Sequence, residues 1–331
     1  MGTVRLARMA MACRFELVLQ GEDELRLRAA GEEALREIER LETRLSRFLP
    51  VSDVSRINTH ASEEAVPVER WLFDLLKQSL DLHRCTDGAF DLTIGPLMKV
   101  WGFYGDGGRV PDADELAQAR LRTGMHLVEL DEAHCTVRFA HKGVALDFGA
   151  IGKGYAVDEA IRILREAGVE RAFLHGGTST MYGIGQPLDA DSWNVAVVDP
   201  RAPDEPVAVV AIRDEALSVS AVSGKSFEVE GTCYGHVLDP RLGKPVRGAL
   251  LAATVTSSAT TADAVSTALL VHARPLPEYR SLVIQPDDEG PLPHRILHHG
   301  IPLCDTSKKT PAPPPAPVLN GHATTWQQHP A

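Results

Sequence analysis

A glycine-rich segment, Gly149-Ala-Ile-Gly-Lys-Gly154, joins an apolar stretch to an amphipathic one. Glycines let a backbone come close to a ligand, and the N-terminal end of a helix attracts negative charge. We therefore predict an apolar strand over residues 145–148, then a turn, then a helix over residues 155–166. The expected ligand of this turn is an anion such as a phosphate.

Lys153, the lysine of this turn, does not belong to a known phosphate motif. A P-loop needs four residues between its glycines and Ser or Thr after its lysine, and the spacing is not Gly-x-Gly-x-x-Gly either. Lys153 is nevertheless placed to approach a phosphate from the turn. A strand-turn-helix corner that carries a solvated lysine explains the same residues equally well.

Asp263 and Thr267 stand four residues apart at the start of a helix predicted over residues 261–272. Residues at this spacing share one helix face, so a carboxylate and a hydroxyl oxygen can reach the same point. Mg²⁺ prefers oxygen ligands, usually one or two carboxylates with water or substrate phosphates. Taken alone, the commoner roles are a carboxylate that complements the helix dipole for Asp263 and a packed side chain for Thr267.

Two further polar residues can take part in chemistry. His236 precedes Val-Leu-Asp-Pro-Arg and can orient a phosphate or move a proton near neutral pH. A lone histidine at a strand end is more often a structural hydrogen-bonding group. Asp147 ends the predicted strand, where its carboxylate can accept a hydrogen bond from a ligand, although a capping or loop aspartate occupies the same kind of position.

The predicted strands and helices that must position these residues do not alternate in the regular way of a doubly wound fold. Apolar residues at three- and four-residue steps predict helices over residues 22–47, 69–85 and 112–120. Period-two stretches predict strands over residues 12–20, 126–130, 136–139, 171–178, 193–200, 207–213, 216–220, 225–229 and 250–256. We expect 126–130 to pair with 136–139, and 216–220 with 225–229, as hairpins. This pattern predicts an α+β fold with mixed sheets and packed helices.

Composition excludes some classes of function. The chain has 331 residues and a formal net charge of -11, which argues against a general positive field for nucleic acid or anionic membranes. No stretch approaches the roughly 20 apolar residues of a spanning helix, and no signal peptide or lipoprotein cleavage site precedes Cys13. Five cysteines without Cys-x-x-Cys spacing indicate neither a disulfide framework nor a zinc site. We expect a cytoplasmic protein that binds no nucleic acid and does not insert into a membrane.

Several separate stretches resemble the FAD:protein FMN transferase (ApbE) family, in the family's order, between about residues 9 and 275. They are Met11-Ala-Cys-Arg-Phe-Glu16, Leu45-Ser-Arg-Phe-Leu-Pro50 with Ser52-Asp-Val-Ser-Arg-Ile-Asn58, Asp87-Gly-Ala-Phe-Asp-Leu-Thr-Ile-Gly-Pro-Leu97 with Trp101-Gly-Phe103, the glycine-rich turn itself, His236-Val-Leu-Asp-Pro-Arg-Leu-Gly243, and Thr261-Ala-Asp-Ala-Val-Ser-Thr267. No single motif is decisive, but their common register makes chance similarity improbable.

The resemblance implies a magnesium-dependent enzyme of the ApbE-like α+β fold. It would transfer FMN from FAD to a Ser or Thr hydroxyl of a partner protein and release AMP. His236 is the catalytic candidate, and either His236 or a carboxylate at the metal would take the proton from the acceptor hydroxyl. The resemblance implies metal ligation by Asp263, Thr267 and an oxygen of Ala150, its backbone carbonyl because its side chain has no oxygen. The FAD contacts that it implies are Met11, Phe48, Ala89, Phe90, Asp91, Asp147, Lys153, His236 and Val237.

Some residues depart from the family pattern. Ala12 and Cys13 stand where Gly-Thr is common, Thr178 replaces a frequent aspartate, and Ser218-Val-Ser-Ala221 stands where Ala-Thr-Ser-Gly is usual. Two other activities therefore stay open: an FAD pyrophosphatase that yields FMN and AMP, and a flavin-binding protein without turnover. We expect residues 1–303 to form the flavin transferase domain, and residues 304–331, which are proline-rich, to form a disordered tail.

Overall fold

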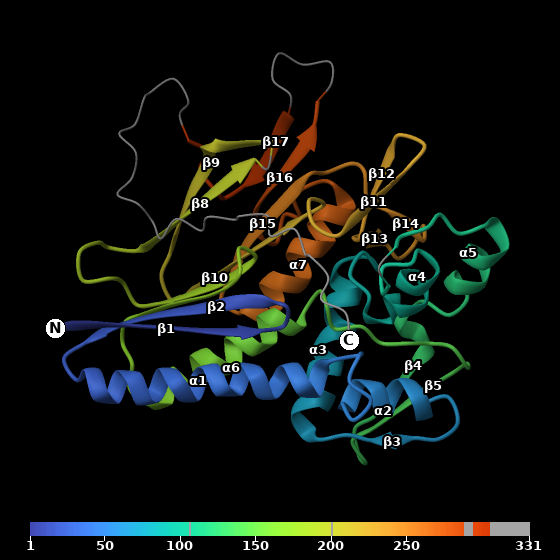
Figure 1. The fold of residues 1–331 in the computed structure, drawn as a ribbon, viewed down its shortest axis with the longest axis horizontal. Coiled ribbons are helices and arrows are strands. Elements are labelled where there is room, and N and C mark those ends of the chain that lie inside the picture. The colour runs from blue at the N-terminus through green and yellow to red at the C-terminus, as the bar shows by residue number, and fades with distance from the viewer. Residues whose placement is uncertain (106, 200, 288–293, 305–331) are drawn as a thin grey trace, which may run out of the picture.

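The computed structural model describes residues 1–105, 107–199, 201–287 and 294–304. Its central feature is an eight-stranded sheet in the order β1-β2-β6-β7-β10-β15-β16-β17, whose neighbouring strands are all antiparallel (Figure 1). Its strands are β1 Gly2–Ala10, β2 Cys13–Gly21, β6 Ala172–Gly176, β7 Thr180–Ile184, β10 Glu215–Ala221, β15 Leu251–Thr256, β16 Arg280–Pro286 and β17 His294–His299.

The helices and the smaller sheets surround this sheet. The helices are α1 Glu24–Leu45, α2 Asp53–His60, α3 Arg70–Cys85, α4 Gly95–Val100, α5 Ala113–Arg120, α6 Gly152–Glu166 and α7 Ala259–His272, with short 3-10 turns at Leu92–Ile94 and Met125–Leu127. The smaller sheets consist of β3 Val66–Pro67, β5 Thr136–Phe139 and β4 Val128–Asp131; β8 Trp193–Asp199 and β9 Ala202–Ile212; β11 Ser226–Val229 and β12 Thr232–Gly235; and β13 Leu238–Asp239 and β14 Lys244–Pro245.

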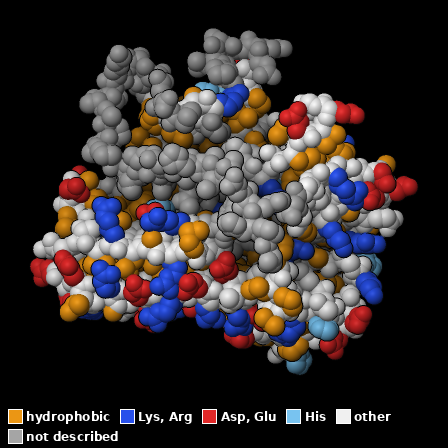
Figure 2. All heavy atoms as spheres, viewed as in Figure 1, with side chains coloured by type: hydrophobic (Ala, Val, Ile, Leu, Met, Phe, Trp, Pro, Cys, Tyr) orange, Lys and Arg blue, Asp and Glu red, His pale blue; other side chains and the backbone are white. Residues whose placement is uncertain are grey.

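Helices and strands cover opposite faces of the large sheet (Figure 1). On one face, α1, α6 and α7 bury a core with β1, β2 and β7, to which α1 contributes Leu35, Ile38 and Leu41. On the other face, the β8–β9 ribbon packs residues such as Val197 and Ile212 onto the sheet. The outer face of α1 carries interspersed acidic and basic side chains along the lower edge of the molecule (Figure 2). The three helices are thereby fixed against the strands whose ends form the site.

Helix α7 lies at the centre of the molecule and is almost entirely buried. Its N-terminus is anchored to α6, because the Asp158 carboxylate accepts hydrogen bonds from the backbone N–H groups of Ala259 at 2.7 Å and Thr260 at 2.8 Å. A carboxylate at a helix N-terminus satisfies free N–H groups and complements the helix dipole. The beginning of α7 is therefore held beside the beginning of α6.

The prediction of an α+β fold with sheets and packed helices is confirmed, and the long helices lie close to their predicted ranges. The predicted strand over residues 145–148 is wrong, because this buried segment is extended but pairs with no strand. The side-chain amide of Asn58 forms the hydrogen bonds that a neighbouring strand would otherwise form with this segment. Asn58 Nδ2 donates to Leu146 O at 3.0 Å, and Leu146 N donates to Asn58 Oδ1 at 2.7 Å. The helix after it begins at Gly152, three residues earlier than predicted.

The predicted pairing of residues 216–220 with 225–229 is also wrong. Strand β10 pairs with β7 and β15, whereas β11 pairs with β12. Several elements were not predicted, among them α4 and the strands β7, β16 and β17 of the large sheet. The sequence reasoning also missed β1, which precedes the first family motif, and α2, whose eight residues are N-capped by Ser52. The hairpin of β4 and β5 confirms the other predicted pairing.

The end of the chain lies mostly outside the described residues. Of the predicted tail, the structure describes only Cys304, whose backbone N–H donates to Val207 O at 3.0 Å. All five cysteines are described and none forms a disulfide. None of the helices in the described ranges is both long and apolar enough to cross a bilayer. The cytoplasmic location stays a prediction.

Candidate active site

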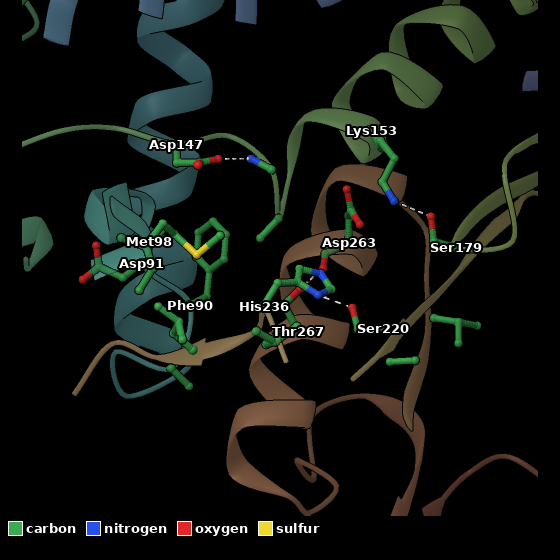
Figure 3. Close-up of a pocket in the computed structure, with 18 of the residues that line it drawn as sticks. Phe90, Asp91, Met98, Asp147, Lys153, Ser179, Ser220, His236, Asp263 and Thr267 are labelled. Carbon is green, nitrogen blue, oxygen red and sulfur yellow. Dashed lines mark hydrogen bonds between the residues drawn. The ribbon is translucent and has the colours of Figure 1, made fainter. Parts of the chain in front are cut away.

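The residues predicted to carry chemistry converge on one cavity of about 570 Å³ (Figure 3). Its walls come from the turn before α6, the end of β10, one face of α7 and the segment after β12. The predicted residues that line it are Ala89, Phe90, Asp91, Asp147, Ala150, Lys153, His236, Val237, Asp263 and Thr267. The other two, Met11 and Phe48, line a neighbouring cavity.

The Asp263 carboxylate is buried where α6 meets α7. Its Oδ2 accepts a hydrogen bond from the backbone N–H of Gly154 at 2.9 Å, and its Oδ1 lies 3.4 Å from Thr180 Oγ1. Burial raises the pKa of Asp263 above its usual value, and the positive charge of Lys153 opposes that rise. A buried carboxylate with mostly neutral partners attracts a further cation.

Gly154 allows the two helices to come this close. A Cβ at this position would lie 2.2 Å from the carbonyl oxygen of Ala259 and 2.8 Å from Asp263 Cβ. Of the three glycines in the turn, Gly154 is thus required by helix packing. Its backbone N–H, which is free because it lies in the first turn of α6, becomes the donor to Asp263.

Lys153 extends into the cavity from the first turn of α6 (Figure 3). Its ammonium group donates a hydrogen bond to Ser179 Oγ, on the turn between β6 and β7. The alternative of a solvated surface lysine does not describe this position, because the side chain is only partly exposed and lines the cavity. Lys153 and the carboxylate of Asp263 therefore border the same space.

Thr267 presents its hydroxyl group to the cavity one helical turn after Asp263 (Figure 3). Its Oγ1 lies 3.3 Å from the backbone oxygen of Asp263 and 3.2 Å from Ser220 Oγ. Ala150, which has no polar side chain, lines the cavity just before α6. A carboxylate, a hydroxyl and a nearby backbone carbonyl are the hard oxygen ligands that suit Mg²⁺.

This mixed oxygen set is the arrangement that could hold a cation here. Among the described residues, no three His, Cys, Asp or Glu side chains gather into a group that could hold a metal ion. The oxygens of Asp263, Thr267 and Ala150 fit magnesium better than a softer metal, because neither thiolate nor several imidazoles face them. Substrate phosphate oxygens and water would have to complete the coordination.

Asp147 holds the glycine-rich turn in place. Its Oδ1 accepts a hydrogen bond from Gly149 N at 2.7 Å (Figure 3). Its Oδ2 accepts one from the Tyr104 hydroxyl at 2.6 Å. Burial raises the pKa of Asp147, opposed by the bond from Gly149 and by Arg47, whose Nη1 lies 3.7 Å from Oδ2. Its carboxylate therefore organises the turn as well as bordering the cavity.

His236 faces the cavity opposite Lys153. Its Nδ1 lies 3.2 Å from the carbonyl oxygen of Lys225, which fixes Nδ1 as the protonated nitrogen of a neutral ring and leaves Nε2 as the acceptor. Burial lowers the pKa of His236, and the bond to Lys225 opposes that effect. The imidazole is therefore neutral at physiological pH and can accept a proton.

The turn Ala89–Asp91 lines the cavity with an apolar surface. Phe90 is buried, and the Asp91 carboxylate points away from Lys153 and Asp263 (Figure 3). Asp91 accepts a hydrogen bond from Thr93 N at 2.7 Å, and His83 Nδ1 lies 3.3 Å from its other oxygen. Burial raises the pKa of Asp91, opposed by these partners. Asp91 therefore shapes the turn and does not present its carboxylate to the cavity.

The neighbouring cavity has a volume of about 460 Å³ and shares four lining residues with the first. The shared residues are Cys13, Asp147, Gly149 and Lys153. Met11 lies in the β1–β2 turn, and Phe48 lies in the loop between α1 and α2 with its ring edge toward Tyr104 at 5.9 Å between centroids. The two cavities thus meet at Lys153, where a long ligand could extend into both.

Five of the departing residues also border this space. Thr178, Val219 and Ala221 line the first cavity, Ala12 lines the second, and Cys13 lines both. Ala12 has φ = 57°, in the left-handed region that favours glycine. The family's preference for glycine at this position therefore has a backbone reason, and alanine adopts the conformation under strain.

Several polar residues of the site were missed by sequence reasoning. They are Arg47, Tyr104, Ser179 and Ser220. Ser218 and Ser220 are two apart on a strand, and Asp263, Ser266 and Thr267 share a helix face, so their spacing offered a signal. Tyr104 gave none, because only the folded chain brings its loop to Asp147.

Comparison with known proteins agrees with this arrangement. A family model described as the ApbE family matches residues 9–279. The FAD:protein FMN transferase of Klebsiella pneumoniae is 31% identical over 263 residues, which cover 76% of this chain and 73% of the relative. A protein of the same name from Treponema pallidum is 31% identical over 257 residues, covering 73% and 71%.

Solved structures show the same fold. The ApbE protein of Thermotoga maritima aligns with a TM-score of 0.79 and 30% identity, covering 86% of this chain and 94% of that one. The flavinyl transferase ApbE of Pseudomonas stutzeri, in its apo form, aligns with a TM-score of 0.79 and 26% identity, covering 90% and 94%. With its sequence motifs, its fold and a family model spanning most of its length, this chain belongs to the ApbE family.

Proposed function

We propose that this protein is a magnesium-dependent FAD:protein FMN transferase, which attaches FMN from FAD to a Ser or Thr hydroxyl of an acceptor protein and releases AMP. The observation that carries the proposal is the meeting of Asp263 and Thr267, on α7, with Lys153, on α6, at one cavity. Relatives named FAD:protein FMN transferase at about 31% identity support the same activity.

The reaction replaces the phosphoanhydride bond between the two halves of FAD by a phosphoester bond to the acceptor. The acceptor oxygen would form a bond to the phosphorus of the FMN half while the bond from that phosphorus to the bridging oxygen breaks. AMP takes the bridging oxygen and its electron pair, and the acceptor hydroxyl loses its proton. No oxidant or reductant is needed. Catalysis then consists mainly of positioning and of stabilising the negative charge that develops.

Lys153 is placed to supply that stabilisation. It lines both cavities, so its ammonium group can contact a pyrophosphate that lies between them. The positive, N-terminal end of the α6 dipole adds positive potential from the same side. A magnesium ion held by Asp263, Thr267 and the Ala150 carbonyl would neutralise further phosphate charge and orient the leaving group.

His236 is the proposed acceptor of the hydroxyl proton. The carbonyl oxygen of Lys225 holds its Nδ1, so its free Nε2 is the nitrogen that can take the proton. Its lowered pKa keeps the ring unprotonated at neutral pH, as a general base requires. The ring lies on the cavity wall across from Lys153, where an incoming acceptor could meet it (Figure 3).

The flat rings of FAD would lie against apolar walls. Phe90 and Ala89 provide one such wall in the first cavity, and Met11 and Phe48 provide another in the second. Asp147 lies where the two cavities meet. Its Oδ2 atom, which accepts a hydrogen bond from the Tyr104 hydroxyl, would accept a second one from the ligand. We further propose that residues 1–303 act as one catalytic unit, because the residues that line the two cavities are spread from Met11 to Thr267.

One incubation tests the proposal against its two rivals. Purified protein is mixed with FAD and Mg²⁺, with and without candidate acceptor proteins, and the products are separated by chromatography and by gel fluorescence. Covalent flavin on a Ser or Thr, located by mass spectrometry, together with AMP, is the expected result. Free FMN with AMP in every mixture would replace the proposal with a pyrophosphatase, and intact FAD throughout would leave only flavin binding. Chelation of Mg²⁺ by EDTA should stop product formation reversibly.

A further inference from the structure

A group of hydroxyl side chains lies between β10 and α7, behind the Asp263 carboxylate. Ser218 and Ser220 are two apart on β10, so they point to the same side of the sheet. Ser266 and Thr267 follow Asp263 by three and four residues on α7, so they point back at that strand. Strand and helix therefore face each other with hydroxyl groups where apolar packing would otherwise be expected.

Ser266 is the centre of this group. Its Oγ lies 3.2 Å from Ser218 Oγ and 2.8 Å from Ser220 Oγ, and it donates to the backbone oxygen of Asp263 at 3.0 Å. A hydroxyl has one proton and two lone pairs, so it can hold several neighbours at once. Ser266 thereby ties β10 to the turn of α7 that carries Asp263.

The two outer positions reach the site in different ways. Ser218 Oγ lies 3.5 Å from the Oδ1 atom of Asp263 and 3.1 Å from Ser179 O, and its single proton can be donated to either oxygen. On the other side, Ser220 Oγ lies 3.2 Å from Thr267 Oγ1, and both of these residues line the cavity. One connected path of hydroxyl groups therefore runs from the carboxylate of Asp263 to the hydroxyl of Thr267.

Ser218 and Ser266 do not contact the cavity themselves. Both side chains are 0% exposed, and neither lines either cavity. A buried hydroxyl costs free energy unless it is hydrogen-bonded, and here each one is bonded to a group that carries or flanks a proposed cation ligand. Their contribution must therefore act through Asp263, Ser220 and Thr267.

We propose that Ser218 and Ser266 are positioning residues for the cation site. Their hydroxyl groups fix the carboxylate of Asp263 and, through Ser220, the hydroxyl of Thr267, so that both oxygens point at one coordination position. This inference rests on the proposed function, because it assumes that these two oxygens bind a divalent cation. Partners of this kind orient metal ligands, and their loss typically weakens metal binding roughly 10- to 100-fold.

Binding of Mn²⁺ alone tests the inference without turnover. Free Mn²⁺ is titrated by electron paramagnetic resonance against FAD-free protein and the variants Ser266→Ala, Ser218→Ala and Asp263→Ala. Ser79→Ala is the matched control, since Ser79 is equally buried and donates only to Leu75 O, on α3. We expect Ser266→Ala to bind Mn²⁺ at least 10-fold more weakly than Ser79→Ala, and the double Ser218→Ala, Ser266→Ala variant to lose less than the product of the two single losses.

Activity gives a second readout. With FAD present, the serine variants should need more Mg²⁺ for half-maximal rate yet regain most of kcat at saturating Mg²⁺, whereas a merely destabilised protein would lose kcat at every Mg²⁺ concentration. Ser266→Cys keeps the shape but is a weak hydrogen-bonding group, so it should repeat the effect even if Ser266→Ala unfolds.

Two outcomes contradict the inference and are distinguishable. If Asp263→Ala loses Mn²⁺ binding while both serine variants match Ser79→Ala, the positioning role is wrong and the cation site stands. If Asp263→Ala binds Mn²⁺ as tightly as the unmodified protein, the cation site of the proposed function is itself wrong.

Discussion

The carboxylate of Asp263 accepts a hydrogen bond from the backbone N–H of Gly154 at 2.9 Å, although 109 positions separate the two residues. This bond joins the first turn of α6, which carries Lys153, to the face of α7, which carries Thr267. The distance between the proposed phosphate-binding lysine and the proposed cation ligands is therefore set by the packing of two helices. Changes at this contact should affect stability and chemistry together.

Gly154→Ala should destabilise the protein, because its Cβ would meet the Ala259 carbonyl oxygen at 2.2 Å. Overpacking of this kind costs about 1–3 kcal/mol or more. Gly152→Ala is a matched control two residues earlier, where a Cβ finds its nearest neighbours at 3.7 Å. Urea unfolding of both variants measures the difference. Equal free energies of unfolding would show that α6 can move away from α7 at little cost.

Asp263→Asn should abolish turnover yet stabilise the cation-free protein at pH 7. An unfolded aspartate ionises near pH 4, whereas burial raises the pKa of Asp263 in the folded chain, so ionisation lowers the free energy of unfolding as the pH rises. We expect the variant to melt at least about 2 °C higher in EDTA at pH 7, with the gain disappearing toward pH 4. Calorimetry over this pH range measures it, and a lower melting temperature at pH 7 would contradict the expectation.

Lys153→Met should reduce kcat for FAD cleavage about 10²- to 10³-fold, the usual effect of removing one preorganised charge-stabilising donor. The methionine keeps the length and much of the apolar contact of the lysine stem, so the fold should be retained. Release of AMP from FAD is the measurement. A variant that cleaves FAD at the normal rate would mean that the ammonium group serves only its bond to Ser179.

The pH dependence of kcat/KM should show an acidic limb that belongs to His236. Burial lowers the pKa of this imidazole below its usual value of about 6.5, so the ring is neutral and able to accept a proton above that lowered pKa, and activity falls only as the pH drops through it. His236→Asn should remove this limb and slow the reaction roughly 10²- to 10⁴-fold. An unchanged acidic limb in the variant would assign it to another group.

Ala12→Gly should stabilise the protein. Ala12 adopts φ = 57°, and a left-handed conformation costs an L-residue with a Cβ roughly 1–2 kcal/mol, of which the greater freedom of an unfolded glycine returns part. We expect a net gain of up to about 1 kcal/mol in the free energy of unfolding. Ala10→Gly, in strand β1, is the control and should destabilise instead. A lower free energy of unfolding for both variants would show that the turn tolerates alanine without strain.

Much of the fold was visible in the sequence, because helices α1, α3 and α6 carry local apolar periodicity. The strand partners of β10 could not be predicted. An alternating pattern shows which residues of a strand share a face, but it does not show which other strand pairs with it. The segment over residues 145–148 reads as a strand because it is apolar, yet the side chain of Asn58 takes the hydrogen bonds of Leu146. No local sequence pattern shows that a side chain, and not a strand, bonds this segment.

The candidate site divides in the same way. Residues such as Lys153 and Asp263 were identified from spacing together with family resemblance, and the structure brings both to one cavity. The partners that orient them were not identified, because Tyr104, Ser179 and Ser266 act through contacts that exist only in the folded chain. Local spacing in the sequence therefore identifies the side chains that would bind the cation or the phosphate better than it identifies the residues that orient those side chains.

The position of α7 near the end of the described chain bears on how the protein is made. A ribosome completes residues 1–258, with the glycine-rich turn and Lys153, before it adds the helix that bears Asp263 and Thr267. A chain that stops before Asp263 lacks both proposed cation ligands. Such an unfinished chain should therefore bind no divalent cation at this site, even though it already carries Lys153.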